Sequence, residues 1–163
     1  NPQGKLFGGE ILDAQIILAG EIGNESGAKM VVNLAASGAD VTAETDQCLK
    51  DLAQTDSQLD TLQEAIEKAD QVKDAEKKKL LLAKIGATQT HYCQQAEQLE
   101  KKLSSLEHHL HDLLEDAELV VNKALHSGVE IHIFDKVLRT NRQYPPCKVK
   151  LEENKIEVEF KTS

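Results

Sequence analysis

Histidine is the residue type whose spacing in this sequence comes closest to a chemical site. Six histidines are present, and His108, His109 and His111 lie within four residues of one another. On a helix, His108 with His111 and Asp112, or His111 with Glu115, would share one face at spacings of three and four residues, which could bring ligands to one metal ion. The same positions fall outside the apolar repeat described below, on a solvated flank where histidines need no ligand. We therefore predict no metal site, with His108, His111 and Asp112 as the candidates for one.

Catalytic chemistry has no comparable pattern. A left-handed β-helix acyltransferase needs a histidine near the edge of a coil as general base, and residues 1–90 contain none. The stretch from Gly20 to Gly23 lacks the lysine and hydroxyl side chain of a phosphate-binding loop. We predict no catalytic residues and no cofactor. A metal or small molecule bound in a deep pocket would revive an enzymatic interpretation.

The cysteines indicate the compartment. Cys48, Cys93 and Cys147 are odd in number and far apart, and no two of them form a CxxC pair. This spacing signals neither a disulfide framework nor a zinc module. A reducing compartment is the expected location.

The overall charge excludes two classes of partner. The chain has 163 residues and a formal net charge of −9, with its lysines interleaved among Glu and Asp. Nucleic acid and anionic membranes both call for a basic surface, and an acidic chain of this kind has no obvious one. No apolar run reaches the roughly 18 residues that a membrane span needs. We predict neither nucleic-acid binding nor a membrane span.

A heptad pattern from about Thr45 to Ala124 organises the chain. Apolar residues recur there at alternating spacings of three and four, as in a coiled-coil seam. The second half of the seam is Leu82, Ile85, Tyr92, Ala96, Leu99, Leu103, Leu106, Leu110, Leu113, Ala117, Val120 and Ala124, and the first half is Cys48, Leu52, Leu59, Leu62, Ile66 and Ala69. The pattern predicts an antiparallel coiled-coil hairpin over residues 41–126, with a coiled coil between two copies of the chain as the alternative.

Two arguments disagree on where this hairpin turns. The seam fades between Ala69 and Lys79, which favours a turn there. Arms of equal length would instead put the turn near residue 84, next to Gly86, which could supply a left-handed stop. We predict the tip within residues 70–88 and favour Gly86.

The flanking segments predict short strands. Residues 4–34 place isoleucines about every five to six residues, with glycines and alanines between them. This spacing suits either stacked coils of a parallel β-helix or a β-meander with glycine turns. Residues 129–133, 137–140, 147–151 and 156–160 alternate apolar and polar residues, as half-buried strands do. The chain therefore divides into a β part over residues 1–40, the hairpin over 41–126, and a second β part over 127–163.

Three motifs resemble the C-terminal part of the bacterial flagellar assembly protein A family. They are GGEILDA at residues 8–14, IILAGEIG at residues 16–23 and SGVEIHI at residues 127–133, with the long coil between the second and the third. The resemblance implies an α+β fold in which a right-handed parallel β-helix is interrupted by an antiparallel coiled-coil hairpin. The N-terminal portion of a full family member is missing, and the chain begins at Asn1 without Met, so we expect a fragment of a longer protein.

The resemblance also implies a non-enzymatic cytoplasmic role in assembling or placing the polar flagellum, with the cell pole as the location. The expected partners are proteins, such as regulatory or flagellar-placement proteins, bound by the coiled-coil arm. A second copy of the chain is a further candidate. The alternative hypothesis is a self-assembling β-helix polymer or a structural protein of the cell pole, because unpaired strand edges can stack.

Overall fold

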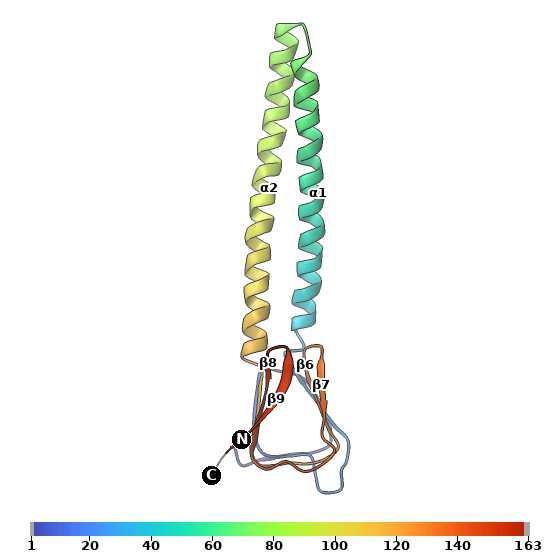
Figure 1. Cartoon of the computed structure of the whole chain (residues 1–163), viewed down its shortest axis with the longest axis vertical. Helices are drawn as coiled ribbons and strands as arrows, with labels where there is room; N and C mark the ends of the chain where they lie inside the picture. The colour runs from blue at the N-terminus through green and yellow to red at the C-terminus, as the bar shows by residue number, and fades with distance from the viewer. Residues whose placement is uncertain (1, 162–163) are drawn as a thin grey trace. The chain divides into compact units, whose positions relative to one another are not determined.

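The computed structural model describes residues 2–161 of the chain, which form two compact units. The β unit comprises Asn1–Val41 with His109–Ser163, and the helical unit comprises Thr42–His108. Within the described residues the chain forms nine strands and two long helices (Figure 1). The fold is therefore of the mixed α+β class, as predicted.

The β unit contains two sheets whose strands alternate along the chain. One sheet has the order β1 (Lys5–Leu6), β3 (Ile16–Ile22), β5 (Glu118–Leu125), β8 (Cys147–Glu152) and β9 (Lys155–Phe160). The other has the order β2 (Gly9–Ala14), β4 (Met30–Leu34), β6 (Val129–Ile133) and β7 (Lys136–Arg139). Strands β1, β3 and β5 are parallel, as are β2, β4 and β6. The chain thus climbs in three successive rungs, and this parallel pairing excludes the β-meander alternative.

The C-terminal strands depart from the predicted β-helix. Strand β7 pairs antiparallel with β6, β8 pairs antiparallel with β5, and β9 pairs antiparallel with β8. Only short connections separate β6 from β7 and β8 from β9, and a short turn reverses the chain, whereas a parallel partner needs a longer crossover. Residues 136–160 therefore do not add further parallel rungs.

The core of the β unit follows from the alternation along its strands. In β3, β4, β5 and β6, aliphatic side chains at alternate positions are almost completely buried, because successive side chains on a strand point to opposite faces. The buried set includes Ile17, Ala19, Ile22, Val32, Leu34, Leu119, Val121, Leu125, Ile131 and Ile133. These side chains form one apolar cluster.

The helical segment is an insertion between two rungs. Strands β3 and β5 pair directly, with Ile17 opposite Leu119, although almost a hundred residues separate them along the chain. Strands β4 and β6 do the same, with Val32 opposite Ile131. The ladders of both sheets therefore continue across the insertion, which contributes no strand to either.

The predicted extent of the second helix is wrong at its C-terminal end. Helix α2 ends at Glu115, and residues 118–125, expected as helix up to 126, form strand β5. The heptad positions Ala117, Val120 and Ala124 lie in or beside a short apolar run, Leu119 to Val121, and such a run can form a strand as well as a helix. In the fold, Leu119 and Val121 are fully buried and Val120 is only half-buried, so the period of two prevails.

Helices α1 (Gly38–Asp70) and α2 (Ala75–Glu115) form an antiparallel pair within one chain, which we call the helical hairpin (Figure 1). Lys102 forms an ion pair with Glu44 at 2.8 Å, and the Cys48 thiol donates to the Leu99 carbonyl at 3.3 Å. The predicted seam residues of both helices, up to Leu113, are buried or half-buried. A narrow apolar seam with charged flanks explains why this part folds as paired helices.

The turn of the helical hairpin lies at residues 71–74, inside the predicted range but not at Gly86. The Asp74 carboxylate accepts hydrogen bonds from the backbone N–H groups of Glu76 and Lys77, which caps the start of α2. Gly86 lies within α2, and the two helices contain 33 and 41 residues. The two helices differ in length, so the turn does not lie at the midpoint near Gly86, and it lies instead where the apolar seam fades after Ala69.

The position of Gly86 can be tested by substitution. We expect Gly86→Ala to raise the free energy of unfolding of the helical hairpin by about 0.5–1 kcal/mol, because glycine is unfavourable in a helix interior. An added Cβ would meet no heavy atom within 4 Å. Urea unfolding followed by circular dichroism at 222 nm, a wavelength at which helix dominates, measures the change. A decrease in stability would contradict the helical placement and favour a left-handed stop at this residue.

Candidate functional site

The candidate metal ligands lie on the exposed surface of α2. His111 Nδ1 is 3.7 Å from Asp112 Oδ1, and His111 Nε2 is 3.4 Å from Glu115 Oε1. His108 is also exposed on this helix. In residues 2–161, no three His, Cys, Asp or Glu side chains are grouped so that they could hold a metal ion. The absence of a metal site stays a prediction.

The three cysteines are free thiols in different environments. Cys48 and Cys147 are buried, and Cys93 is exposed. Burial raises the pKa of the Cys147 thiol, so that less of it is the reactive thiolate at neutral pH. These two buried cysteines therefore act as small apolar residues, Cys147 in the sheet core and Cys48 in the helical seam.

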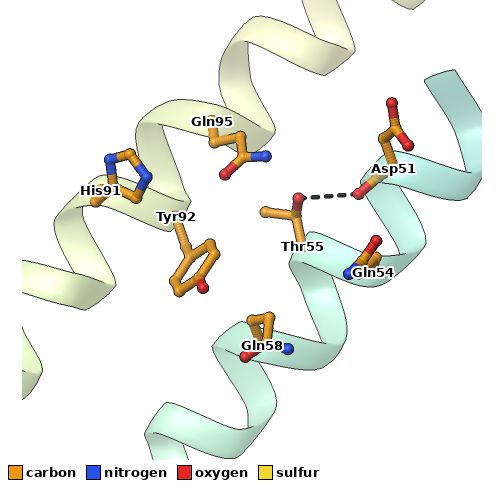
Figure 2. A pocket seen from close by; sticks show the side chains of 7 residues that line it. All are labelled: Asp51, Gln54, Thr55, Gln58, His91, Tyr92 and Gln95. Carbon is orange, nitrogen blue, oxygen red and sulfur yellow. Dashed lines mark hydrogen bonds between the residues drawn. The ribbon is translucent and has the colours of Figure 1, made fainter.

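A polar cleft of about 330 Å³ lies between the two helices (Figure 2). Its lining residues carry amide, hydroxyl, imidazole or carboxylate groups: Asp51, Gln54, Thr55 and Gln58 of α1, and His91, Tyr92 and Gln95 of α2. The rings of His91 and Tyr92 meet edge to face, with centroids 5.6 Å apart. The side chains shown in Figure 2 offer several hydrogen-bond donors and acceptors and one carboxylate, that of Asp51.

Thr55 is the buried member of this cleft and is a residue that the sequence argument missed. Its side chain is 2% exposed, and its hydroxyl donates to the Asp51 carbonyl at 2.9 Å. Because the Thr55 hydroxyl donates its proton to a backbone carbonyl one helical turn earlier, no base in the cleft accepts that proton. The cleft is therefore suited to polar contact and not to nucleophilic chemistry at Thr55. The signal was the seam itself, because Thr55 lies three residues after Leu52 and four before Leu59.

A second hollow, of about 390 Å³, lies in the β unit around Glu21. The Lys5 ammonium is 2.8 Å from the Glu21 carboxylate, and Nε2 of the buried His126 is 3.6 Å from the same oxygen. The hydrogen bond from Lys5 holds the pKa of Glu21 below its ordinary value. A carboxylate kept ionised by a lysine serves as an acceptor and is a poor general acid. Because Lys5 already occupies this carboxylate, the arrangement is a structural ion pair and not an acid catalyst.

Glu130 links β6 to β7 by a similar arrangement. It accepts from Arg139 Nε at 2.9 Å and lies 2.8 Å from His132 Nε2, and these contacts, Arg139 first, lower the pKa of Glu130. Because the pKa of Glu130 is lower in the folded than in the unfolded chain, its ionised carboxylate stabilises the fold at pH values above the ordinary pKa of 4.5. This stabilisation is lost as the pH falls through the lower pKa of the folded state. Arg139 is exposed, so the contribution is reduced by solvent.

We therefore expect Glu130→Gln to make the β unit less dependent on pH. The free energy of unfolding, measured in urea between about pH 7 and about pH 3, should fall for both proteins but less steeply for Glu130→Gln. Glu153→Gln, at an exposed turn residue, is the matched control and should follow the unmodified chain. Equal slopes for all three proteins would contradict a role for Glu130.

One family of known proteins matches this chain. The β-solenoid domain of flagellar assembly protein A matches residues 1–156, a range that includes the helical insertion and the strands from β1 to β8. No curated protein matches the chain, and no solved structure does. Neither helix of the described residues is long and apolar enough to cross a membrane.

Proposed function

Because the chain belongs to the flagellar assembly protein A family, we propose that it acts in flagellar assembly as a non-enzymatic scaffold or adaptor. The β unit serves as a rigid base, and the helical hairpin is a coiled-coil arm that binds a protein partner. The protein works in the bacterial cytoplasm, at the cell pole where the flagellum is polar. Candidate partners are regulatory or flagellar-placement proteins.

The observation that carries this proposal is the insertion itself. Strands β3 and β5, and strands β4 and β6, pair as neighbouring rungs with the two helices inserted between them. A short loop would be enough to connect β4 to β5, because loops inside compact domains are usually about 4–6 residues long. A helical insertion of this length adds no strand, and it exposes two charged helical flanks that suit recognition of another protein.

Excision of the hairpin tests the proposal directly. Residues 42–108 are replaced by a short Gly/Ser linker. Such a linker can join the two ends because they lie close together: a Cβ added to Gly38 would lie 3.2 Å from Cδ1 of Leu110. The full chain and the excised variant are compared in a bacterium lacking its own copy, by counting flagella and by affinity pull-down. We expect the excised variant to lose both flagella and partner recovery.

A matched control separates recognition from spacing. In it, residues 42–108 are exchanged for an unrelated antiparallel coiled coil of the same length. Tyr144 lies in the β unit, and its fluorescence during urea unfolding shows whether that unit folds in each variant. Normal flagella and partner recovery with the excised or the exchanged variant would contradict the proposal.

Self-assembly is the second candidate function. Strand β2 lies at the edge of its sheet and exposes 73% of Leu12, and Phe7, next to edge strand β1, is 64% exposed. Edge strands with apolar side chains can pair with another copy. Sedimentation velocity over a wide concentration range tests this candidate, because a species that stays monomeric at every concentration would argue against a polymer.

A further inference from the structure

The turn of the helical hairpin has a surface chemistry that differs from the rest of the chain. Residues 71–84 contain five lysines and two acidic residues, a net charge of +3 within a chain of net charge −9. Leu80 and Leu81 in the same segment are 62% and 42% exposed. We define the tip surface as Val72, Lys77, Lys79, Leu80, Leu81 and Lys84.

Two hollows on either side of Leu80 shape this surface. One, of about 330 Å³, is lined by Val72, Lys77, Leu80, Leu81 and Lys84. The other, of about 380 Å³, is lined by Glu76, Lys77, Lys79, Leu80 and Ala83. Leu80 and Lys77 line both, so one exposed apolar side chain and one ammonium group lie between the two hollows. Apolar side chains next to polar groups are found in protein interfaces, which have an apolar centre and a polar rim.

Two of the three lysines of the tip surface, Lys79 and Lys84, are not explained by an ion pair within the hairpin, whereas Lys77 lies 3.8 Å from the Asp74 carboxylate. Lys77 and Lys79 lie in the first two turns of α2, where the helix dipole disfavours positive charge. Lys78 does have a structural contact, because its ammonium lies 3.1 Å from the Asp70 carboxylate across the turn. Within residues 2–161, by contrast, Lys79 and Lys84 form no ion pair. Their charges remain available to an acidic partner.

We infer that the tip surface binds an acidic amphipathic helix of a partner protein, an inference that rests on the proposed function and specifies its contact. Apolar side chains one turn apart on such a helix would enter the two hollows beside Leu80. Glutamates or aspartates on its flanks would face Lys77, Lys79 and Lys84. Helix-in-groove docking of this kind takes its affinity from the apolar anchors and its specificity from the charges.

The position of the leucines favours a protein partner over an anionic membrane. Leu80 and Leu81 lie five and six residues after the start of α2 at Ala75, about 8 Å along the helix from the turn. They therefore lie on the side of the hairpin, whereas end-on insertion into a bilayer would use the residues of the turn itself. Those residues, Gln71 to Asp74, include one apolar side chain, Val72.

The test uses the full chain and a designed peptide as probe. The peptide has about 18 residues, or five helical turns, with leucines at helical spacing on one face and glutamates elsewhere. Its fluorescence anisotropy reports binding to the full chain, to Leu80→Asn/Leu81→Asn and to Lys77→Glu/Lys84→Glu. We expect each double variant to weaken binding at least about tenfold, because hot-spot contacts are lost. Raising the ionic strength should weaken binding to the full chain as well.

Leu49→Asn/Lys50→Glu is the matched control, because this adjacent Leu–Lys pair is exposed elsewhere on the hairpin. It should bind the peptide like the full chain. A peptide with lysines in place of the glutamates should not bind. Circular dichroism confirms that all variants remain helical, as expected for changes at exposed positions.

Three outcomes would overturn the inference. The first is that the acidic peptide does not bind the full chain, and the second is that it binds the tip variants equally well. The third concerns phosphatidylcholine vesicles that contain about one third phosphatidylglycerol. If the full chain co-sediments with them and the tip variants do not, while the peptide binds the full chain and the tip variants equally, the ligand is a membrane instead. If excision of the hairpin abolishes partner recovery but the tip variants keep it, the inference fails and the proposed function stands.

Discussion

We expect Gly128→Ala to destabilise the β unit by about 3–5 kcal/mol, because two unfavourable effects act at the same atom. Gly128 has a φ of +82°, a conformation that alanine adopts at a cost of about 1–2 kcal/mol. An added Cβ would also lie 2.5 Å from the carbonyl oxygen of Gly27, which is backbone and cannot rotate away. Gly27 and Gly128 precede β4 and β6, so the contact joins the corners of two neighbouring rungs.

Gly9→Ala is the control for the conformational effect alone. Gly9 also has a φ of +82°, but an added Cβ would meet nothing within 4 Å. We expect it to cost only about 1–2 kcal/mol. Urea unfolding is followed by Tyr144 fluorescence in a Tyr92→Phe background, because these are the two tyrosines of the chain and only Tyr144 is in the β unit. Equal losses at Gly9 and Gly128 would show that the rung corners are not tightly packed.

Leu119→Ala is expected to have the second largest effect, a loss of about 3–4 kcal/mol in the free energy of unfolding of the β unit. Leu119 is fully buried in the sheet core and lies opposite Ile17 in the parallel ladder. Removing its branched side chain leaves a cavity that the surrounding strands cannot fill without moving. The same urea titration with Tyr144 fluorescence measures the loss.

Val120→Ala is the matched control, and it also tests the strand assignment of residues 118–125. Val120 is half-buried and lies opposite Leu18, which is 41% exposed, so its truncation should cost less than about 1 kcal/mol. In the heptad pattern Val120 would be a seam residue and Leu119 would not. A larger loss at Val120 than at Leu119 would therefore favour the helix that the sequence predicted.

The helices were predictable because their determinants are local. Seam residues such as Leu59 and Leu99 recur at helical spacing, and both become half-buried in the helical hairpin. The fading of the seam after Ala69 located the turn at residues 71–74 within the predicted range. The short strands of residues 129–160 were predictable for the same reason, since alternation is visible within five or six residues.

The candidate functional surfaces were less predictable. The spacing of the histidines near His111 made them candidate ligands, yet they lie on an exposed flank, and the described residues contain no group that could hold a metal ion. Thr55 was overlooked because a polar residue at a seam position is not counted by an apolar pattern. The exposure of Leu80 could not be inferred either, because which face of α2 meets α1 depends on the packing of the pair.

The heptad pattern and the alternating strands, both readable from residue type and spacing, determined that the chain combines paired helices with short strands. Whether residues 118–125 continue the helix or start a new rung was decided only by the tertiary structure. An apolar run such as Leu119 to Val121 satisfies either period, and its choice depends on a partner strand, β3, almost a hundred residues away in the sequence. Burial of Leu119 against that strand favours the strand over the roughly two to three helical turns that residues 116–125 would otherwise add, and no local pattern contains that comparison.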